Sequence, residues 1–177
     1  MGAWDELDIE ISVHLDTTEL DEVINFIESE HPDGALDGHK EAAIQLKHGW
    51  EEGSKRAVED IANRNRSFQD QVIWDVCDNP SGMLASSIDV EAVDEYTYLV
   101  GTRINHIYPM ALEFGRGPIE PINAKALAFY SDTGELIFRK RVGEAKPRPF
   151  VAPAYEDSLA NAKRIMMEYI GDAIKNG

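Results

Sequence analysis

The chain has 177 residues, a mass of 19.8 kDa and a formal net charge of −16, from 17 Lys and Arg against 33 Asp and Glu. Its length suits one domain with a buried core, and a hydrophobic content of 43% excludes a wholly disordered chain. An acidic surface repels a nucleic-acid backbone. No apolar run approaches the roughly 20 residues that a membrane helix needs, which excludes a spanning protein.

The acidity has two explanations that composition alone does not separate. Acidic side chains can coat the surface for solubility, including in a high-salt host, or they can line a path that DNA traverses without binding. Eight Lys against nine Arg and 33 acids favours a halophilic origin, with an ordinary acidic protein as the alternative. The single cysteine, Cys77, allows no disulfide within the chain, which fits a reducing compartment. We expect no secretory signal in the first six residues, since they lack a basic flank and an apolar segment.

The N-terminal part predicts a strand followed by a helix. Apolar and polar residues alternate over 7–15, which is typical of a half-buried strand. Thr18 followed by Asp21 resembles a capping box, and apolar residues then recur at helical spacing. Pro32 and Gly34 are expected to end this helix.

A longer helical pattern begins near Leu36. One face carries five apolar side chains, those of Ala43, Leu46, Trp50, Ala57 and Ile61. Gly49 and Gly53 flank Trp50 and each cost a helix about 1 kcal/mol relative to Ala, so they predict either the close approach of a neighbouring element or a kink. The pattern weakens over 63–66, resumes over 72–77 and breaks at 79–82.

Beyond this break the hydrophobic period changes from helical to two. Residues 88–92 and 96–100 alternate around a turn at 94–95, which predicts a β-hairpin. A short helix is expected over 108–114, and a second hairpin over 127–139 with its turn at 131–134. Prolines punctuate an extended segment from Pro147 to Pro153, and a C-terminal helix follows. Its buried side is predicted to carry Leu159, Ala162, Ile165, Met166, Tyr169, Ile170 and Ala173.

These elements predict an α+β fold in which a small, predominantly antiparallel sheet packs against a long helix and a C-terminal helix. We expect a single domain over 1–177. It comprises an N-terminal strand and helices in 1–79, a β-rich part in 80–145, and a proline-rich segment with the C-terminal helix in 146–177. The sheet is predicted to pack on the helix face of Leu46 and Trp50. Its expected contributors are Met83, Leu84, Ile88, Val90, Tyr98 and Val100.

No residue pattern nominates a catalytic, metal-binding or cofactor-binding site. Five histidines, at positions 14, 31, 39, 48 and 106, share no metal-ligand spacing with one another or with Cys77. Cys77 lacks the local signature of a nucleophile and fits a small buried residue. Gly115-Arg116-Gly117 is followed by proline and not by a helix, which disfavours a phosphate loop. We therefore predict no enzyme, no metal and no cofactor.

Four segments in order carry a resemblance to a known family. The first is the amphipathic helix around 43–61, and the second is PSGMLASSI at 80–88. The third runs from VGT at 100–102 into YPMALEFG at 108–115, and the fourth is PRPFVAPA at 147–154, before the C-terminal helix. This order resembles the neck, or tail-completion, proteins of long-tailed double-stranded DNA viruses. The chain departs from the family pattern at Ser81 and Arg116, where the family usually has Thr, and its N-terminal strand and first helix are additions.

The resemblance implies a virion structural protein of the head–tail junction. Such a protein forms a homo-oligomeric ring, expected to be a hexamer, through which DNA passes as cargo and which joins the tail to the capsid connector. The implied partners are other copies and neighbouring head-completion and tail proteins, and the implied location is the virion after assembly in the host cytoplasm. A negative lumen would avoid phosphate contacts that retard DNA ejection. The tail terminator that caps the tail tube is the nearest alternative; an acidic DNA mimic and a metal-dependent hydrolase are alternatives from other classes.

The resemblance also implies structural roles for one set of residues: Gly82, Leu84, Ile88, Gly101, Tyr108, Glu113, Phe114 and Gly115. For the last three we expect contacts within the chain. A second set is predicted at the subunit interface: Arg139, Arg141, Lys146, Arg148, Pro149, Phe150 and Pro153.

The interface prediction rests on charge. Like subunits of charge −16 repel, so close packing needs local positive charge, and five of the 17 basic residues lie within 139–148. Phe150 is the expected apolar anchor and Arg148 the charged one. The alternatives are a core position for Phe150 and a solvated hairpin edge for the basic cluster.

Overall fold

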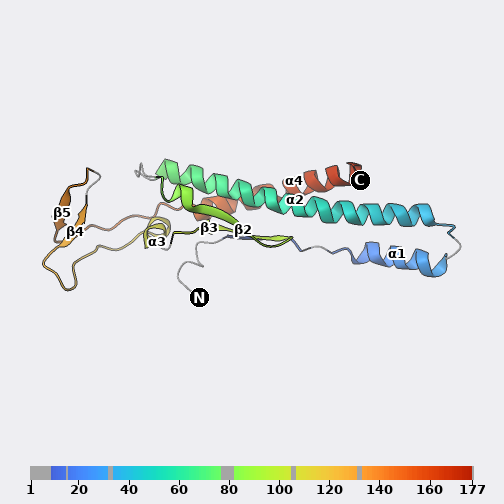
Figure 1. The fold of residues 1–177 in the computed structure, drawn as a ribbon, viewed down its shortest axis with the longest axis horizontal. Helices are drawn as coiled ribbons and strands as arrows, with labels where there is room; N and C mark the ends of the chain where they lie inside the picture. The colour runs from blue at the N-terminus through green and yellow to red at the C-terminus, as the bar shows by residue number, and fades with distance from the viewer. Residues whose placement is uncertain are drawn as a thin grey trace.

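The structure, a computed structural model, describes residues 9–14, 16–31, 34–76, 82–104, 107–130 and 133–176. The molecule is elongated, because a 40-residue helix, α2 (Asp37–Val76), forms its axis and α4 (Val151–Asn176) runs alongside it (Figure 1). A three-stranded antiparallel sheet packs on α2, and a two-stranded sheet lies at one end. The predicted α+β class, with a small antiparallel sheet against a long helix and a C-terminal helix, is confirmed.

The larger sheet has the strand order β1-β3-β2. Its central strand β3 (Thr97–Thr102) pairs with β2 (Ile88–Asp94) as the predicted hairpin, and with β1 (Ile9–Ser12) on its other side. A 3₁₀ turn, Ala85–Ser87, leads into β2, and the short helix α3 (Ile107–Phe114) follows β3. The smaller sheet is the second predicted hairpin, β4 (Leu127–Tyr130) with β5 (Leu136–Arg139).

Small residues let α2 and α4 come very close together. A Cβ built on Gly53 would lie 2.6 Å from the Cα of Ile170, and one on Gly49 would lie 3.1 Å from the Cα of Ile174. The glycines therefore mark a close approach, the first of the two alternatives that the sequence left open. Further along α2, the buried Asn65 amide donates to the carbonyl of Ala154 and to Ser158 Oγ, at 3.0 and 2.8 Å. The polar stretch at 63–66 is thus part of one continuous helix.

The buried face of α2 agrees with the predicted one at Ala43, Ala57 and Ile61 and differs from it at Leu46 and Trp50. It repeats every four residues along Gly49, Gly53, Ala57, Ile61, Asn65, Gln69 and Ile73. Leu46 and Trp50, predicted beneath the sheet, are 42% and 41% exposed, and Met83 is also exposed. Close helix packing favours small side chains on the contact line, so the bulky residues lie beside it. On α4, Ile165 and Ile170 are buried as predicted, whereas Leu159 is exposed.

Two ion pairs join helix α1 (Thr18–Glu30) to α2. The predicted capping box at the start of α1 is wrong, because the N-cap residue makes no side-chain capping hydrogen bond there. The N-terminal N–H of Thr18 bonds to Asp16 Oδ1, while Asp21 turns towards α2 and meets Lys47 Nζ at 2.6 Å. This hydrogen bond lowers the pKa of Asp21 below its usual value and raises that of Lys47. Lys40 and Glu28 form a second ion pair, also at 2.6 Å.

Helix α4 begins at Val151, so Pro153 lies in its first turn and not in an extended approach. Proline is tolerated there because the first N–H groups of a helix have no partner within it. Some predicted features fall outside the described residues: positions 7, 8 and 15 of the first strand, 79–81 of the break, 131–132 of the turn, and Pro32, Cys77 and His106. Within the described ranges, no helix is both long and apolar enough to cross a membrane.

Candidate subunit-interaction surfaces

A buried carboxylate joins α3 to the start of α4. Glu113 Oε2 accepts the backbone N–H groups of Phe150 and Val151, at 2.7 and 3.0 Å, and its Oε1 accepts that of Ala152 at 3.1 Å. The side chain thereby caps the N-terminus of α4 from another element and places negative charge at the positive end of the helix dipole. The role within the chain expected for Glu113 is confirmed.

Close backbone contacts also hold the residues on either side of this cap. Gly115 has φ +74°, and a Cβ there would lie 2.7 Å from the carbonyl oxygen of Ala145 and 2.9 Å from Pro147. The N–H of Arg148 donates to the carbonyl of Leu112 at 2.7 Å. Gly115 therefore also acts within the chain, as expected. Phe114 differs from this expectation, since the residue is 57% exposed.

Three of the residues singled out by the resemblance, Leu84, Ile88 and Tyr108, meet in one core cluster. The cluster contains Ala62 and Ile73 of α2, with Leu84, Ala85, Ile88, Val100, Leu112 and Phe150; Tyr108 packs against it partly buried. Gly101 is buried in β3, and Gly82 adopts φ +61° before the 3₁₀ turn.

Phe150 is fully buried in this cluster, so the predicted role as the apolar anchor of an interface is wrong. The bond from the Phe150 N–H to Glu113 fixes this residue directly before α4, where its side chain is fully buried in the core. Its neighbour Arg148, the predicted charged anchor, donates from Nη1 to the carbonyl of Val76 at 2.9 Å, which ties it to the end of α2.

Residues 115–148 form a projection from the body, which we call the arm. The arm leaves the body after α3, and its two sides pair through bridges between Arg116 and Ala145 and between Ile119 and Val142. The hairpin β4–β5 forms its tip, well apart from the body (Figure 1). Of the predicted interface residues, Arg139 and Arg141 lie near this tip, exposed. Lys146, Arg148 and Pro149 lie at the root and Pro153 in α4, so the structure divides the set between the tip, the root and the first turn of α4.

The arm exposes large apolar side chains, which sequence reasoning missed. Ile122 is 94% exposed, Tyr130 74% and Phe138 62%. Ile119, Phe129 and Leu136 are exposed as well. A two-stranded hairpin is marginally stable by itself in water, so this tip gains from a partner that covers it.

Charge is segregated between the arm and the body. Residues 115–148 contain seven basic and four acidic residues, a net charge of +3, which leaves −19 for the rest of the chain out of the total of −16. Arg141 pairs loosely with Glu120 at 3.5 Å, and the Arg116 guanidinium donates to the carbonyl of Gly143. Among the described residues, Lys125, Arg139, Lys140 and Lys146 form no ion pair. The arm is therefore a basic, apolar projection from an acidic body.

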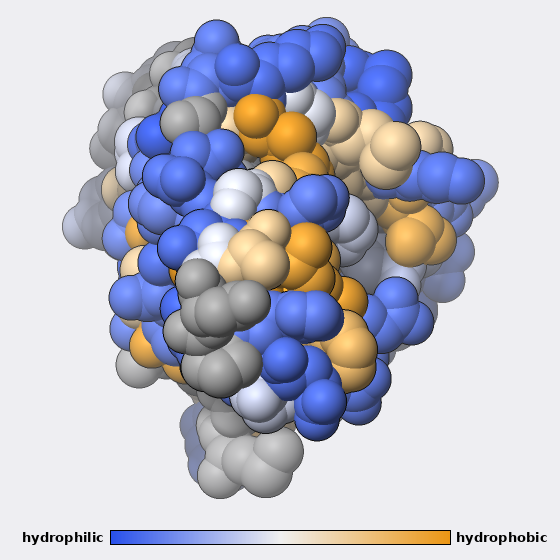
Figure 2. All heavy atoms as spheres, turned by 90° about the vertical axis from the view of Figure 1, so that its right-hand side faces the viewer, coloured by the Kyte–Doolittle hydropathy of each residue, from blue (hydrophilic) through white to orange (hydrophobic). Residues whose placement is uncertain are grey.

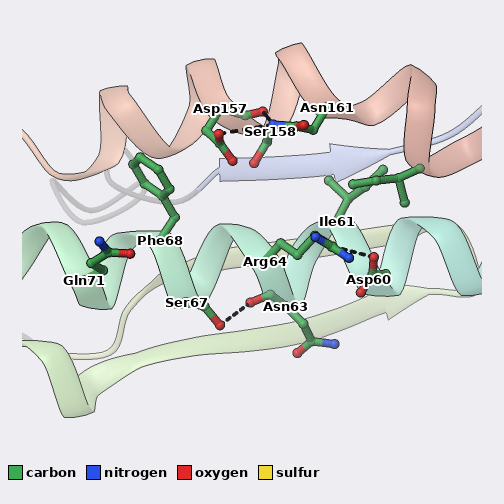
Figure 3. A pocket seen from close by; sticks show the side chains of 11 residues that line it. Asp60, Ile61, Asn63, Arg64, Ser67, Phe68, Gln71, Asp157, Ser158 and Asn161 are labelled. Atoms are coloured by element: carbon green, nitrogen blue, oxygen red, sulfur yellow. Dashed lines mark hydrogen bonds and ion pairs between the residues drawn. The ribbon is translucent and has the colours of Figure 1, made fainter.

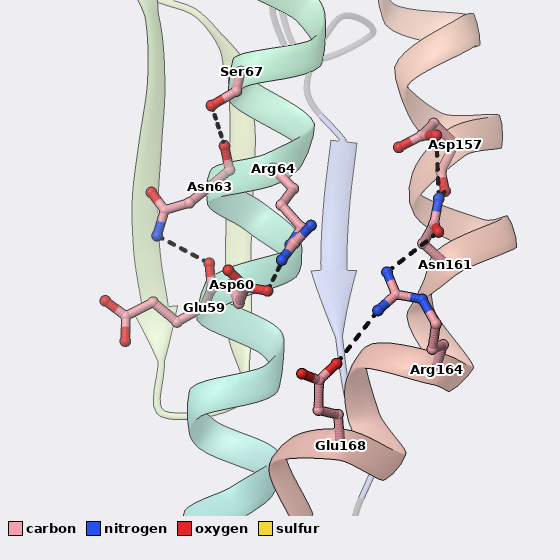
Figure 4. Close-up of polar contacts among 9 residues, drawn as sticks. All are labelled: Glu59, Asp60, Asn63, Arg64, Ser67, Asp157, Asn161, Arg164 and Glu168. Atoms are coloured by element: carbon pink, nitrogen blue, oxygen red, sulfur yellow. Dashed lines mark hydrogen bonds and ion pairs between the residues drawn. The ribbon is translucent and has the colours of Figure 1, made fainter.

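A polar groove of about 600 Å³ lies between α2 and α4, lined by Asp60, Arg64, Phe68, Asp157 and Asn161, among others (Figure 3). Its side chains pair locally along each helix. Arg64 Nε meets Asp60 at 2.6 Å, and Asn161 donates to Asp157. Outside the lining, Arg164 of α4 meets Glu168 at 3.3 Å (Figure 4). Such pairing is typical of a solvated helix surface.

Two other grooves are apolar. One, of about 240 Å³, lies between β1 and α4 and is lined by Ile11, Val13, Ile61, Tyr155, Leu159 and Met166, among others. The second, of about 470 Å³, lies where α1 meets α2 and α4, lined by Leu20, Leu46, Trp50 and Ile174 beside polar residues. Figure 2 shows apolar side chains in a hollow between hydrophilic surfaces at this end of the molecule.

In the described part of the chain, no three His, Cys, Asp or Glu side chains converge to hold a metal ion. Comparison with known proteins found no family model that matches the chain, no similar curated protein and no similar solved structure.

Proposed function

We propose that this chain is a virion structural protein of the head–tail junction. In this role it forms a ring through which DNA passes and which joins the tail to the capsid connector. The observation that carries the proposal is the shared core of the four segments that resemble neck proteins. Ala62, Leu84, Val100, Leu112 and Phe150 lie in one cluster, just after or within those segments.

This convergence matters because each segment alone is a weak signal. The stronger support comes from specific contacts between the segments, because a shared core is expected of any chain that folds as one domain. Here the Glu113 carboxylate of the third segment caps the helix that begins in the fourth, and Gly115 packs on Pro147. The segments are therefore parts of one structural unit, as expected if they derive from a common family architecture.

The charge distribution supports a ring that conducts DNA. Six copies of a −16 chain would carry −96, and outside the arm every copy is acidic. A lumen formed by the bodies would repel phosphates and so leave passing DNA unbound. The basic arm offers the attraction between subunits that such acidic bodies need to pack together.

The test is made on particles of the virus that encodes the chain. Gold-labelled antibody should mark the head–tail junction, and deletion of the gene should yield DNA-filled heads and separate tails. Purified protein should restore joining. Label on free tail tubes without heads would instead indicate the tail terminator, and normal joined particles without the protein would refute both.

A further inference from the structure

The hairpin at the tip of the arm carries large apolar residues on both of its faces. The register pairs Ala128 with Phe138 and Tyr130 with Leu136 on one face, and Phe129 with Ile137 on the other. Because cross-strand neighbours share a face, neither side of the ribbon is polar throughout. The tip lies at the end of the molecule opposite to α1, away from the three-stranded sheet (Figure 1). Its own body therefore does not cover it.

The apolar groove between β1 and α4 offers a matching surface. One wall is the outer edge of β1, which pairs with β3 on its other side. The N–H of Val13 donates to the carbonyl of Tyr96, just before β3. By the alternation of an antiparallel strand, the backbone groups of Glu10 and Ser12 therefore point to the other edge, with which no strand of the described residues pairs. The opposite wall presents exposed apolar side chains of α4, with Leu159 67% exposed.

We infer that the β4–β5 hairpin of one copy lies in the β1–α4 groove of the next copy. An edge strand beside an apolar helix face accepts an added strand through backbone bonds and side-chain burial together. About 14 residues separate the root from the tip, and fully extended chain rises about 3.3 Å per residue, so the reach of the arm has an upper limit of about 45 Å.

Charge selects a second copy as the occupant. Arg139 ends β5 and Lys140 follows it. Exposed Glu10 lines the groove, and exposed Glu156 follows the lining residue Tyr155 in sequence; these four make no ion pair among the described residues. Arms that met one another instead would bring together charges of +3. Since hairpin and groove are different surfaces of one chain, the contact is head-to-tail, which closes into a ring when the rotation allows. The inference thus rests on, and deepens, the proposed ring.

Cross-linking tests the contact directly. In a Cys77→Ser background, copies with Phe138→Cys are mixed with copies with Leu159→Cys and oxidised. We expect mixed dimers, and a ladder up to the ring order when one chain carries both cysteines. Cross-links only among Phe138→Cys copies would show that arms meet arms and would overturn the inference, as would no cross-link at all.

A second measurement uses light scattering on variants whose altered residues are exposed. Tyr130→Ser with Phe138→Ser on the arm, or Leu159→Glu in the groove, should leave monomers with an unchanged unfolding temperature. Phe26→Ser, an equally exposed apolar position on α1, should assemble like wild type. Normal assembly of the arm variant and of the groove variant contradicts the inference. A wild-type chain that stays monomeric at high concentration contradicts it as well.

The particle assay separates this inference from the proposed function. If the chain assembles through arm and groove but is absent from particles, the contact stands and the head–tail role fails. If the arm variant still joins heads to tails, the head–tail role stands and the contact fails.

Discussion

Gly53 is the position where α2 and α4 leave the least room for a side chain. A Cβ at this site would lie 2.6 Å from Ile170 Cα, 2.9 Å from its N and 3.0 Å from the Tyr169 carbonyl oxygen, whereas ordinary contact begins at 3.4 Å. All three obstacles are backbone atoms, which no rotamer change moves. Gly53→Ala therefore forces the two helices apart locally.

The expected free-energy change combines two opposing effects. Alanine favours a helix over glycine by about 1 kcal/mol. Overpacking a tight contact costs about 1–3 kcal/mol, and the immobile backbone puts this site at the upper end. We expect a net loss of about 2 kcal/mol in the free energy of unfolding, which lowers the melting temperature by about 4–8 °C for a chain of this size.

Gly171→Ala is the matched control, because it lies in α4 and a Cβ there would meet nothing within 4 Å. It should gain about 0.5–1 kcal/mol through helix propensity alone. Both variants are compared by urea denaturation and thermal melting. A Gly53→Ala chain as stable as Gly171→Ala would refute the close approach of α2 and α4.

Three further predictions concern the cap, the ion pairs and the salt response. Glu113→Ala leaves three N–H groups at the start of α4 without their acceptor, so urea denaturation should show a loss of about 2–4 kcal/mol in the free energy of unfolding. Glu113→Gln should lose about half as much. A loss below about 0.5 kcal/mol for Glu113→Ala contradicts the cap. The pKa of Asp21 is lowered, so its ion pair with Lys47 stabilises α1 at neutral pH. This stabilisation is lost as the pH falls through the lowered pKa. Amide hydrogen exchange should show α1 losing protection over that range in the wild type and not in Asp21→Asn. The melting temperature should keep rising into multimolar salt if the acidity reflects a halophilic host, and a response that is flat above physiological salt excludes it.

Local periodicity was enough to predict the elements and their order. The alternation over 88–100 and 127–139 predicted both hairpins, and helical spacing predicted α1, α2 and α4. The buried face of α2 could not be obtained this way, because hydropathy assigns Leu46 and Trp50 to the core while close packing selects Gly49 and Gly53. The pairing of β1 with β3 joins segments about 90 residues apart, and no local pattern encodes it.

The candidate interface stays a prediction, but Phe150 as its apolar anchor was wrong. The basic cluster at 139–148 does lie on a projection, yet Phe150 is buried because Glu113, 37 residues earlier, holds its backbone. One signal for the tip was present in the sequence. LAFY at 127–130 and LIF at 136–138 place large apolar residues at both parities, so a strand that reads this way leaves neither face for solvent.

The root of the arm joins residues of the core to the surface that we propose for assembly. A ring closes only when each copy meets the next at one fixed rotation; a variable angle yields open or irregular chains. The arm starts at Gly115, packed on Pro147, and ends at Arg148, whose N–H bonds to Leu112 and whose guanidinium bonds to Val76. These contacts fix both ends of the arm to α2 and α3, and the Glu113 cap locks them to α4. Because its root is held in the core, the arm has a fixed direction relative to the body. A contact at the tip would therefore set a fixed rotation between one copy and the next.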